Sequence, residues 1–148
     1  MQYLNPWLVL VLIIAGLQLP ACQQHSSTHH FEHPAKVELI EGSELSRVTL
    51  TEKAAQRIDL KTDQVREATV KRSATKRRVV PYSSLIYDPN GQTWVYTSAK
   101  PLTFVRHKVE VDYIEGDVAV LNDGPPTGTV VASVGVAELY GTEYEVGH

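Results

Sequence analysis

The sequence predicts a small, mainly β protein: a β-barrel or β-roll with one short helix, preceded by a signal peptide and a flexible tether. Short stretches of alternating apolar residues, separated by turn residues, recur from residue 46 to the end of the chain. Before them come an uncharged apolar run and then a polar segment rich in histidine. With 148 residues, the chain suits one modest domain. We therefore expect a signal peptide at 1–21, a tether at 22–45 and a β-domain at 46–148.

The N-terminal segment indicates a lipid anchor. Residues 7–19 (WLVLVLIIAGLQL) carry no charge, and their strongly apolar part is shorter than the roughly 20 residues of a membrane span. Such a run is typical of a signal peptide. The sequence Leu19-Pro20-Ala21-Cys22 that follows resembles a bacterial lipobox. The resemblance implies a diacylglycerol on the sulfur of Cys22 and cleavage after Ala21. The alternative is an ordinary secreted protein with a free thiol.

The segment after Cys22 is expected to be a tether on the periplasmic side of the envelope. Residues 23–35 are polar and lack apolar periodicity. Gln23 stands where an aspartate would signal inner-membrane retention, so the lipoprotein resemblance favours the outer membrane. Imidazoles suit Cu²⁺ and Zn²⁺, and the tether carries four of them, at His25, His29, His30 and His33. Ordering a flexible segment costs about 1–2 kcal/mol per residue. We therefore expect weak metal binding at most, or only a solvated linker.

The first structured elements are expected from residue 46. Residues 47–50 predict a strand, and Thr51 is placed to cap a short helix that buries Ala55 and Ile58. Residues 60–71 predict one extended strand. In residues 71–78 (KRSATKRR), five of eight side chains are basic. We interpret this segment as a solvated loop; the alternative is contact with anionic headgroups, which contributes about 1 kcal/mol per basic residue.

The rest of the chain predicts β-hairpins. Residues 79–98 predict two strands joined by a turn at residues 88–91 (DPNG). Residues 104–123 repeat the pattern around Glu115-Gly116, and residues 129–139 predict a last long strand. Trp94 and Val95 are expected on opposite faces, which leaves open whether the Trp94 ring enters the core.

The composition points away from catalysis and nucleic-acid binding. A net charge of −3 gives no general attraction to nucleic acid. The sequence has no Gly-rich phosphate loop, CxxC pair or Ser/His/Asp set, so we expect neither an enzyme nor a cofactor other than the lipid. Ser83 and Ser84 fall in an expected strand, and His107 is expected to be a half-exposed strand residue.

Two tyrosines near the C-terminus are candidate partner-binding residues. Tyr140 and Tyr144 are amphipathic side chains flanked by the acidic residues Glu138, Glu143 and Glu145. They either form a docking surface or belong to a final strand pair that covers the end of the barrel.

Residues 46–148 resemble the membrane-proximal domain of periplasmic adaptor subunits of RND-type efflux pumps, the membrane fusion protein family. The resemblance lies in the order of three segments: an entry segment at 47–65 (RVTLTEKAAQRIDLKTDQV), a return segment at 79–98 and a closing segment at 104–148. In the return segment the matching positions are Val80, Pro81, Ser83, Ser84, Leu85, Trp94, Val95 and Tyr96.

The resemblance implies docking on an RND pump or on a full-length adaptor. In the family a lipoyl-like domain, a helical hairpin and a second barrel separate the entry and return segments, whereas here only the loop at 71–78 does. The chain is therefore not expected to bridge pump and channel by itself. A lipid-anchored accessory or truncated adaptor is our leading hypothesis. The alternatives are a heavy-metal-binding lipoprotein that uses the histidines, since one branch of the family serves metal efflux, and a purely structural envelope lipoprotein.

Overall fold

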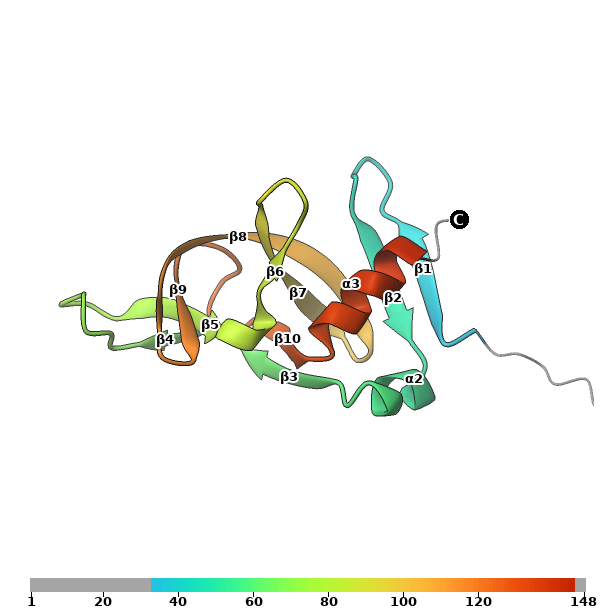
Figure 1. The fold of residues 1–148 in the computed structure, drawn as a ribbon, viewed down its shortest axis with the longest axis horizontal. Helices are drawn as coiled ribbons and strands as arrows, with labels where there is room; N and C mark the ends of the chain where they lie inside the picture. The colour runs from blue at the N-terminus through green and yellow to red at the C-terminus, as the bar shows by residue number, and fades with distance from the viewer. Residues whose placement is uncertain (1–32, 146–148) are drawn as a thin grey trace, which may run out of the picture. The chain divides into compact units, whose positions relative to one another are not determined.

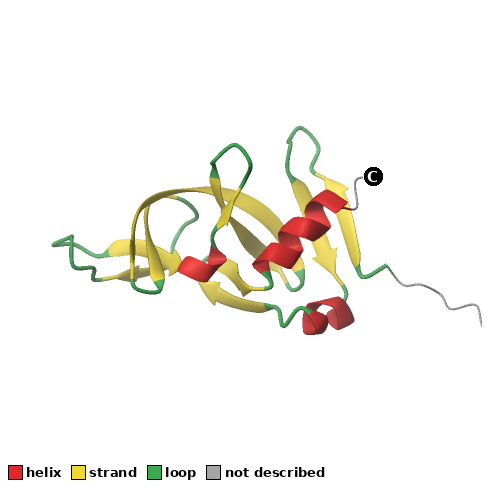
Figure 2. Cartoon of the chain, in the orientation of Figure 1, coloured by secondary structure: helices red, strands yellow, loops and turns green. Residues whose placement is uncertain are grey.

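The computed structural model describes residues 33–145, which belong to one compact unit (Figure 1). The strands are β1 (Ala35–Leu39), β2 (Ser46–Leu50), β3 (Lys61–Gln64), β4 (Arg66–Ala68), β5 (Arg77–Pro81), β6 (Ile86–Tyr87), β7 (Thr93–Lys100), β8 (Thr103–Glu115), β9 (Val118–Asp123) and β10 (Val130–Val134). The helices are α2 (Glu52–Arg57), the 3₁₀ turn η1 (Tyr82–Ser84) and α3 (Val136–Glu145). Strands predominate, which confirms the predicted fold class (Figure 2).

The sheet turns back on itself through one short segment. Its strands follow the order β3–β10–β7–β8–β9–β5–β4, and every pairing along this path is antiparallel. β3 and β4 stand at opposite ends of the path, yet only Val65 separates them in the chain. The Val65 N–H donates to the carbonyl of Thr129, and the Val65 carbonyl accepts from the N–H of Gly128. Residues 61–68 thus join both ends, which gives the small barrel or roll.

The inside of the barrel is filled by small aliphatic side chains. A narrow barrel has room only for side chains, and β-branched residues suit its pleated walls. Strands β5, β7, β8, β9 and β10 contribute to this core, as does the β3–β4 junction. The buried residues are Val65, Val80, Val95, Val109, Ala119, Leu121 and Val131.

A second core lies on the outer face of the same sheet. Successive residues of a strand point to opposite faces, so Val95 enters the barrel while its neighbour Tyr96 faces outward. α2 and α3 cover this outer face, and Figure 1 shows α3 running across the sheet. The β1–β2 hairpin extends the face, because β2 pairs with β8. The buried members are Val48, Leu50, Ala54, Ala55, Tyr96, Phe104, Ala132, Val136 and Leu139. Strands β7, β8 and β10 contribute to both cores and therefore carry apolar side chains on both faces.

The longest strand, β8, stands in the middle of the strand path. It has 13 residues, of which the first pair with β2 and β7 and the last pair with β9. Its register against β9 shifts between Glu110 and Val111 and again between Val111 and Tyr113. Such bulges bend a strand and increase its twist, and here they accompany the passage of β8 from one set of partners to the other.

Local sequence signals placed several elements correctly. Thr51 caps α2, because its Oγ1 accepts a hydrogen bond of 3.1 Å from the N–H of Ala54. In the turn before β7, Asp88 Oδ1 accepts from the N–H groups of Asn90 and Gln92, and Gly91 has a φ of 75°. Both features are decided by neighbouring residues, which explains why sequence alone predicts them.

The predicted tether is too long at its C-terminal end. Residues 35–39, which we expected to lie in the tether, form β1 and pair with β2 from Ala35↔Leu50 to Leu39↔Ser46. Ala35 and Val37 pack against the outer core. The ordered domain therefore includes β1, and residue 46 is not its start. The single strand expected at 60–71 is also wrong, since Val65 separates β3 from β4.

Two further expected strands are interrupted. β5 ends at Pro81, and Ser83 and Ser84 lie in η1 rather than in a strand. The strand expected at 129–139 stops at Val134, and α3 follows. Gly135 sits at this junction with a φ of 80°, a conformation that glycine adopts without steric cost. The final strand pair that we considered for the C-terminus is therefore absent from the described residues, because this stretch is helical.

Replacing Gly135 tests the strand-to-helix junction. A Cβ at this position would lie 3.1 Å from Ile58 Cδ1, in addition to the strained φ. We expect Gly135→Ala to lower the free energy of unfolding by about 1–3 kcal/mol, measured by urea denaturation. Gly141 is the matched control inside α3: a Cβ there meets nothing within 4 Å. Gly141→Ala should instead stabilise by about 0.5–1 kcal/mol. Equal effects of the two substitutions would contradict this account.

Candidate docking site on helix α3

Helix α3 has one face in the outer core and one face toward solvent. Leu139 is completely buried and Val136 nearly so, whereas Ala137 and Glu138 between them are exposed. The helix contacts β1, β2 and β6. Its solvent-facing side is therefore framed by the β1–β2 hairpin and the short strand β6 (Figure 1).

A buried charged network fixes the C-terminal turn of α3. The Tyr96 hydroxyl donates to Glu143 Oε2 at 2.6 Å, and Arg106 Nε donates to Glu143 Oε1 at 3.0 Å. Tyr96 and Arg106 are directly opposite each other on β7 and β8. Arg106 and Glu143 are each only 7% exposed. A single carboxylate thus ties the helix to two neighbouring strands.

The electrostatics of this network keep its donors protonated. Burial, together with the Glu143 carboxylate, raises the pKa of Tyr96 well above its usual range. Burial, the largest single influence, would lower the pKa of Arg106, but the charge and hydrogen bond of Glu143 together with the neighbouring tyrosines outweigh it, and the pKa is raised. Arg106 therefore stays charged, and removing Glu143 would leave a buried guanidinium without its counter-ion.

Two aromatic rings enclose the guanidinium of Arg106. Its Cζ lies 4.8 Å from the ring centroid of Trp94 and 5.3 Å from that of Tyr144. Trp94 is only half-buried, and its Nε1 donates to Asp88 Oδ2 at 3.1 Å. The fully buried aromatic side chain of β7 is Tyr96. Trp94 is therefore part of the Arg106 enclosure, and Tyr96 occupies the core.

The two tyrosines that we predicted to bind a partner differ in how far they are exposed. Tyr140 and Tyr144 lie one helical turn apart, with ring centroids 4.7 Å from each other. Tyr140 packs against the outer core, whereas Tyr144 is 48% exposed. Tyr144 is held between Tyr140 and Arg106. Of the two, Tyr144 is the one available to a partner.

Glu143 is a residue whose role the sequence reasoning missed. We identified it only as one of three acidic residues that flank the tyrosines, but it is buried and attaches the helix to the sheet. The available signal was Arg106: it stands two residues after Phe104 and so shares its face of β8. A charged side chain on a sheet face that is covered by other elements requires a buried partner.

The other exposed large apolar side chains next to α3 lie on the elements that frame it. Tyr87 of β6 is exposed, and so is Leu39 at the end of β1. Both elements contact α3.

Most of the predicted tether residues lie outside the described part of the chain. Cys22, His25, His29 and His30 belong to residues 1–32, and only His33 is described, as an exposed side chain. Within residues 33–145, no group of His, Cys, Asp or Glu side chains is arranged to hold a metal ion. No helix of this same part is long and apolar enough to cross a membrane. Lipidation and metal binding stay predictions.

The basic segment at 71–78 is only partly a loop. Arg77 and Arg78 lie in β5, where Arg77 Nη2 is 3.0 Å from Asp112 Oδ2 and Arg78 Nη1 donates to the carbonyl of Gly124. Lys71, Arg72 and Lys76 remain exposed at the tip of the β4–β5 hairpin. The prediction of a solvated loop holds for the tip, and the two strand arginines have protein partners.

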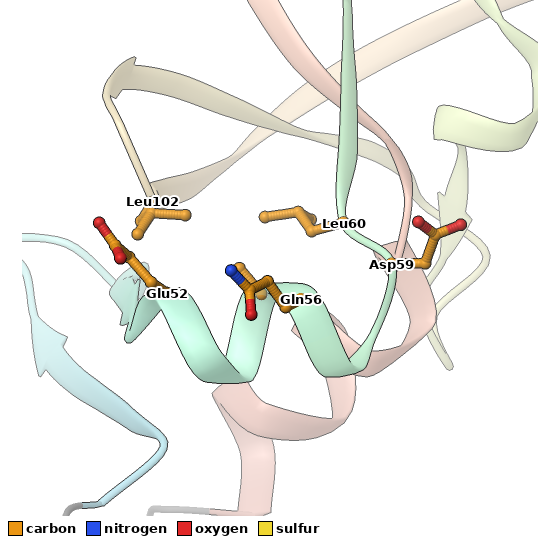
Figure 3. A pocket seen from close by; sticks show the side chains of 6 residues that line it. Glu52, Gln56, Asp59, Leu60 and Leu102 are labelled. Carbon is orange, nitrogen blue, oxygen red and sulfur yellow. The ribbon is translucent and has the colours of Figure 1, made fainter.

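A surface hollow lies beside α2 (Figure 3). Its volume is about 390 Å³, and Leu60 and Leu102 point into it between the carboxylates of Glu52 and Asp59. Asp59 and Leu102 both have positive φ angles, of 49° and 58°. Its lining residues are Glu52, Ala55, Gln56, Asp59, Leu60 and Leu102. This set offers no nucleophile with an adjacent base, so nothing in it supports catalysis.

No family model matches the chain, and no curated protein matches it. The resemblance to efflux adaptors therefore rests on the three sequence segments described above.

Removing single members of the network tests its role in stability. Glu143→Ala should lower the free energy of unfolding by about 3–5 kcal/mol, because Arg106 stays buried without a counter-ion. Tyr96→Phe removes one hydrogen bond to a charged group and should cost about 1.5–3 kcal/mol. Glu138→Ala, at an exposed position of the same helix, should change stability by less than about 0.5 kcal/mol. Urea denaturation measures all three, and a Glu143→Ala effect no larger than that of Glu138→Ala would contradict the account.

Proposed function

We propose that this protein is a lipid-anchored accessory, or truncated adaptor, of an RND-type efflux system, and that it acts by protein–protein docking rather than by catalysis. The lipid on Cys22 holds the domain on the periplasmic side of the envelope. The outer membrane is favoured, because residue 23 is glutamine and not the aspartate that signals inner-membrane retention. The β-domain then contacts the pump or a full-length adaptor through the exposed side of α3. The resemblance of residues 46–148 to the membrane-proximal domain of adaptors supports this assignment.

The observation that carries the docking role is the fixed position of Tyr144. Binding hot spots are enriched in tyrosine, tryptophan and arginine. A side chain that is already ordered before binding loses less conformational entropy when a partner covers it. Tyr144 is exposed, yet Tyr140 and the Arg106 guanidinium restrict its ring. This combination favours a recognition residue over an incidental surface tyrosine.

The β4–β5 hairpin supports the comparison with a truncated adaptor. In the family, further domains separate the entry and return segments. Here β4, which directly follows the entry segment, pairs with β5, which leads into the return segment, with Arg66 opposite Val79 and Ala68 opposite Arg77. The two strands thus pair without the inserted domains, which supports the comparison with a membrane-proximal domain that lacks them.

A pull-down from detergent-solubilised envelopes tests the docking residues. The wild-type protein should recover an RND pump or a full-length adaptor. Tyr144→Ser should reduce that recovery with little change in melting temperature, since the ring is half exposed. Tyr82→Ser is the matched control, because Tyr82 is 49% exposed on a different element, η1. If the wild type recovers neither partner, the proposed function is wrong; if Tyr144→Ser and Tyr82→Ser behave alike, α3 is not the docking surface.

The anchor has its own test. Cys22→Ser should block lipidation and leave either unprocessed precursor or soluble periplasmic protein, because the thiol is the acceptor of the diacylglycerol. Labelled fatty acid should be incorporated into the wild type and not into the variant. Absence of label from the wild type would exclude the lipid anchor.

A further inference from the structure

Strand β1 has one edge without a backbone partner in the described part of the chain. Within residues 33–145, β1 pairs only with β2. Pro34 and Ile40 directly flank β1, and both are hydrogen-bonded toward the β2 side. The carbonyl of Pro34 accepts from the N–H of Thr51, and the N–H of Ile40 donates to the carbonyl of Leu45. Backbone groups alternate in direction along an antiparallel strand. The N–H and C=O groups of residues 35, 37 and 39 therefore point away from β2, toward the open edge.

The charges of β1 are complementary to those of a second β1 strand that runs antiparallel to it. Lys36 and Glu38 flank Val37 symmetrically and share one face of the strand. If a second copy aligns antiparallel with Val37 opposite Val37, each Lys36 faces a Glu38. The pairing also brings the open backbone groups of residues 35, 37 and 39 into hydrogen-bonding positions.

The same charges disfavour the neighbouring registers. A shift of two residues in one direction would place Lys36 opposite Lys36, and a shift in the other would place Glu38 opposite Glu38. Like charges directly opposite each other destabilise a strand pair. Within one chain, Lys36 Nζ lies 2.8 Å from Glu38 Oε1, but this contact is exposed. Exposed ion pairs stabilise little, so the two side chains are free to exchange partners.

An exposed leucine and an adjacent hollow fit the same arrangement. Leu39 is 77% exposed, more than any other large apolar residue in the described chain. In the symmetric register, Leu39 of one copy lies opposite Ala35 of the other. A hollow of about 520 Å³ borders that position, and its lining includes Ala35, Val37 and Leu50. The other lining residues are His33, Lys36, Thr49 and Thr51. In a symmetric pair, the exposed Leu39 of each copy would therefore lie beside the Ala35, Val37 and Leu50 side of the other copy's hollow.

We propose that the protein forms a two-fold symmetric dimer in which β1 pairs with β1 of a second copy, with Val37 at the centre. The partner is the chain itself, because backbone groups, charges and the Leu39 contact are all self-complementary, as an isologous interface requires. The contact is small beside the roughly 1,200–2,000 Å² of stable interfaces, so the dimer is weak in solution. Attachment to one membrane would raise the local concentration of the chains and favour it. The proposal does not depend on the efflux assignment.

Charge exchange at two positions tests the dimer and its register. The experiment uses residues 22–148 carrying Cys22→Ser, which retain the whole described unit, in sedimentation equilibrium at up to about 100 µM. The wild type should be substantially dimeric at this concentration. Lys36→Glu and Glu38→Lys should each weaken dimerisation at least about tenfold, because each places like charges opposite each other. An equimolar mixture of the two variants should restore dimerisation, since every pair is then of opposite sign.

Lys53→Glu is the matched control, since Lys53 is an exposed lysine on α2 and should leave dimerisation unchanged. Melting temperatures of the variants should stay close to that of the wild type, because Lys36 is exposed and Glu38 half exposed. A wild type that is monomeric at about 100 µM would overturn the proposal. So would a dimer that is insensitive to both exchanges, or a mixture that fails to recover dimerisation.

Discussion

The contact of Glu143 with Arg106 and Tyr96 determines how the outer layer of this protein is arranged. Apolar contacts of Val136 and Leu139 hold the first half of α3 on the sheet, but they leave its last turn unspecified. Glu143 attaches that turn to β7 and β8 through charged hydrogen bonds. A buried ion pair gains little net stability, since its desolvation offsets most of the attraction. Its effect here is geometric: it positions Arg106, and Arg106 in turn contacts Trp94 and Tyr144.

The barrel provides the rigid support for that network. Its narrow interior accepts small aliphatic residues, and the β3–β4 junction at Val65 links the two ends of the strand path. The same strands must also present apolar side chains to α3 and α2. Because both faces of these strands are buried, neighbouring residues are buried in different cores: Val95 and Val131 in the inner core, and Tyr96 and Ala132 in the outer core. Without the inner core, Tyr96 and Arg106 would have no fixed positions from which to bind Glu143.

Local chemistry made part of this architecture predictable from sequence. The cap of α2 at Thr51 and the turn stabilised by Asp88 depend on neighbouring residues, so their signals are complete within a few positions. β1 escaped prediction because two of its five residues are charged, and an edge strand tolerates such residues. Helix α3 was missed because its first residues continue an apolar run, and only the backbone of Gly135 marks the change. Glu143 could not be paired with Arg106 from sequence, because 37 positions separate them and tertiary packing alone brings them together.

The central claim is that α3 is locked onto the barrel and presents a preordered Tyr144. Native-state hydrogen exchange of the α3 backbone tests it most directly, because exchange separates local opening from global unfolding. The account predicts that the amides of Leu139 to Glu143 exchange with the same opening free energy as those of β7 and β8. Exchange of the α3 amides through a local opening several kcal/mol below global unfolding would show a loosely attached helix and contradict the account.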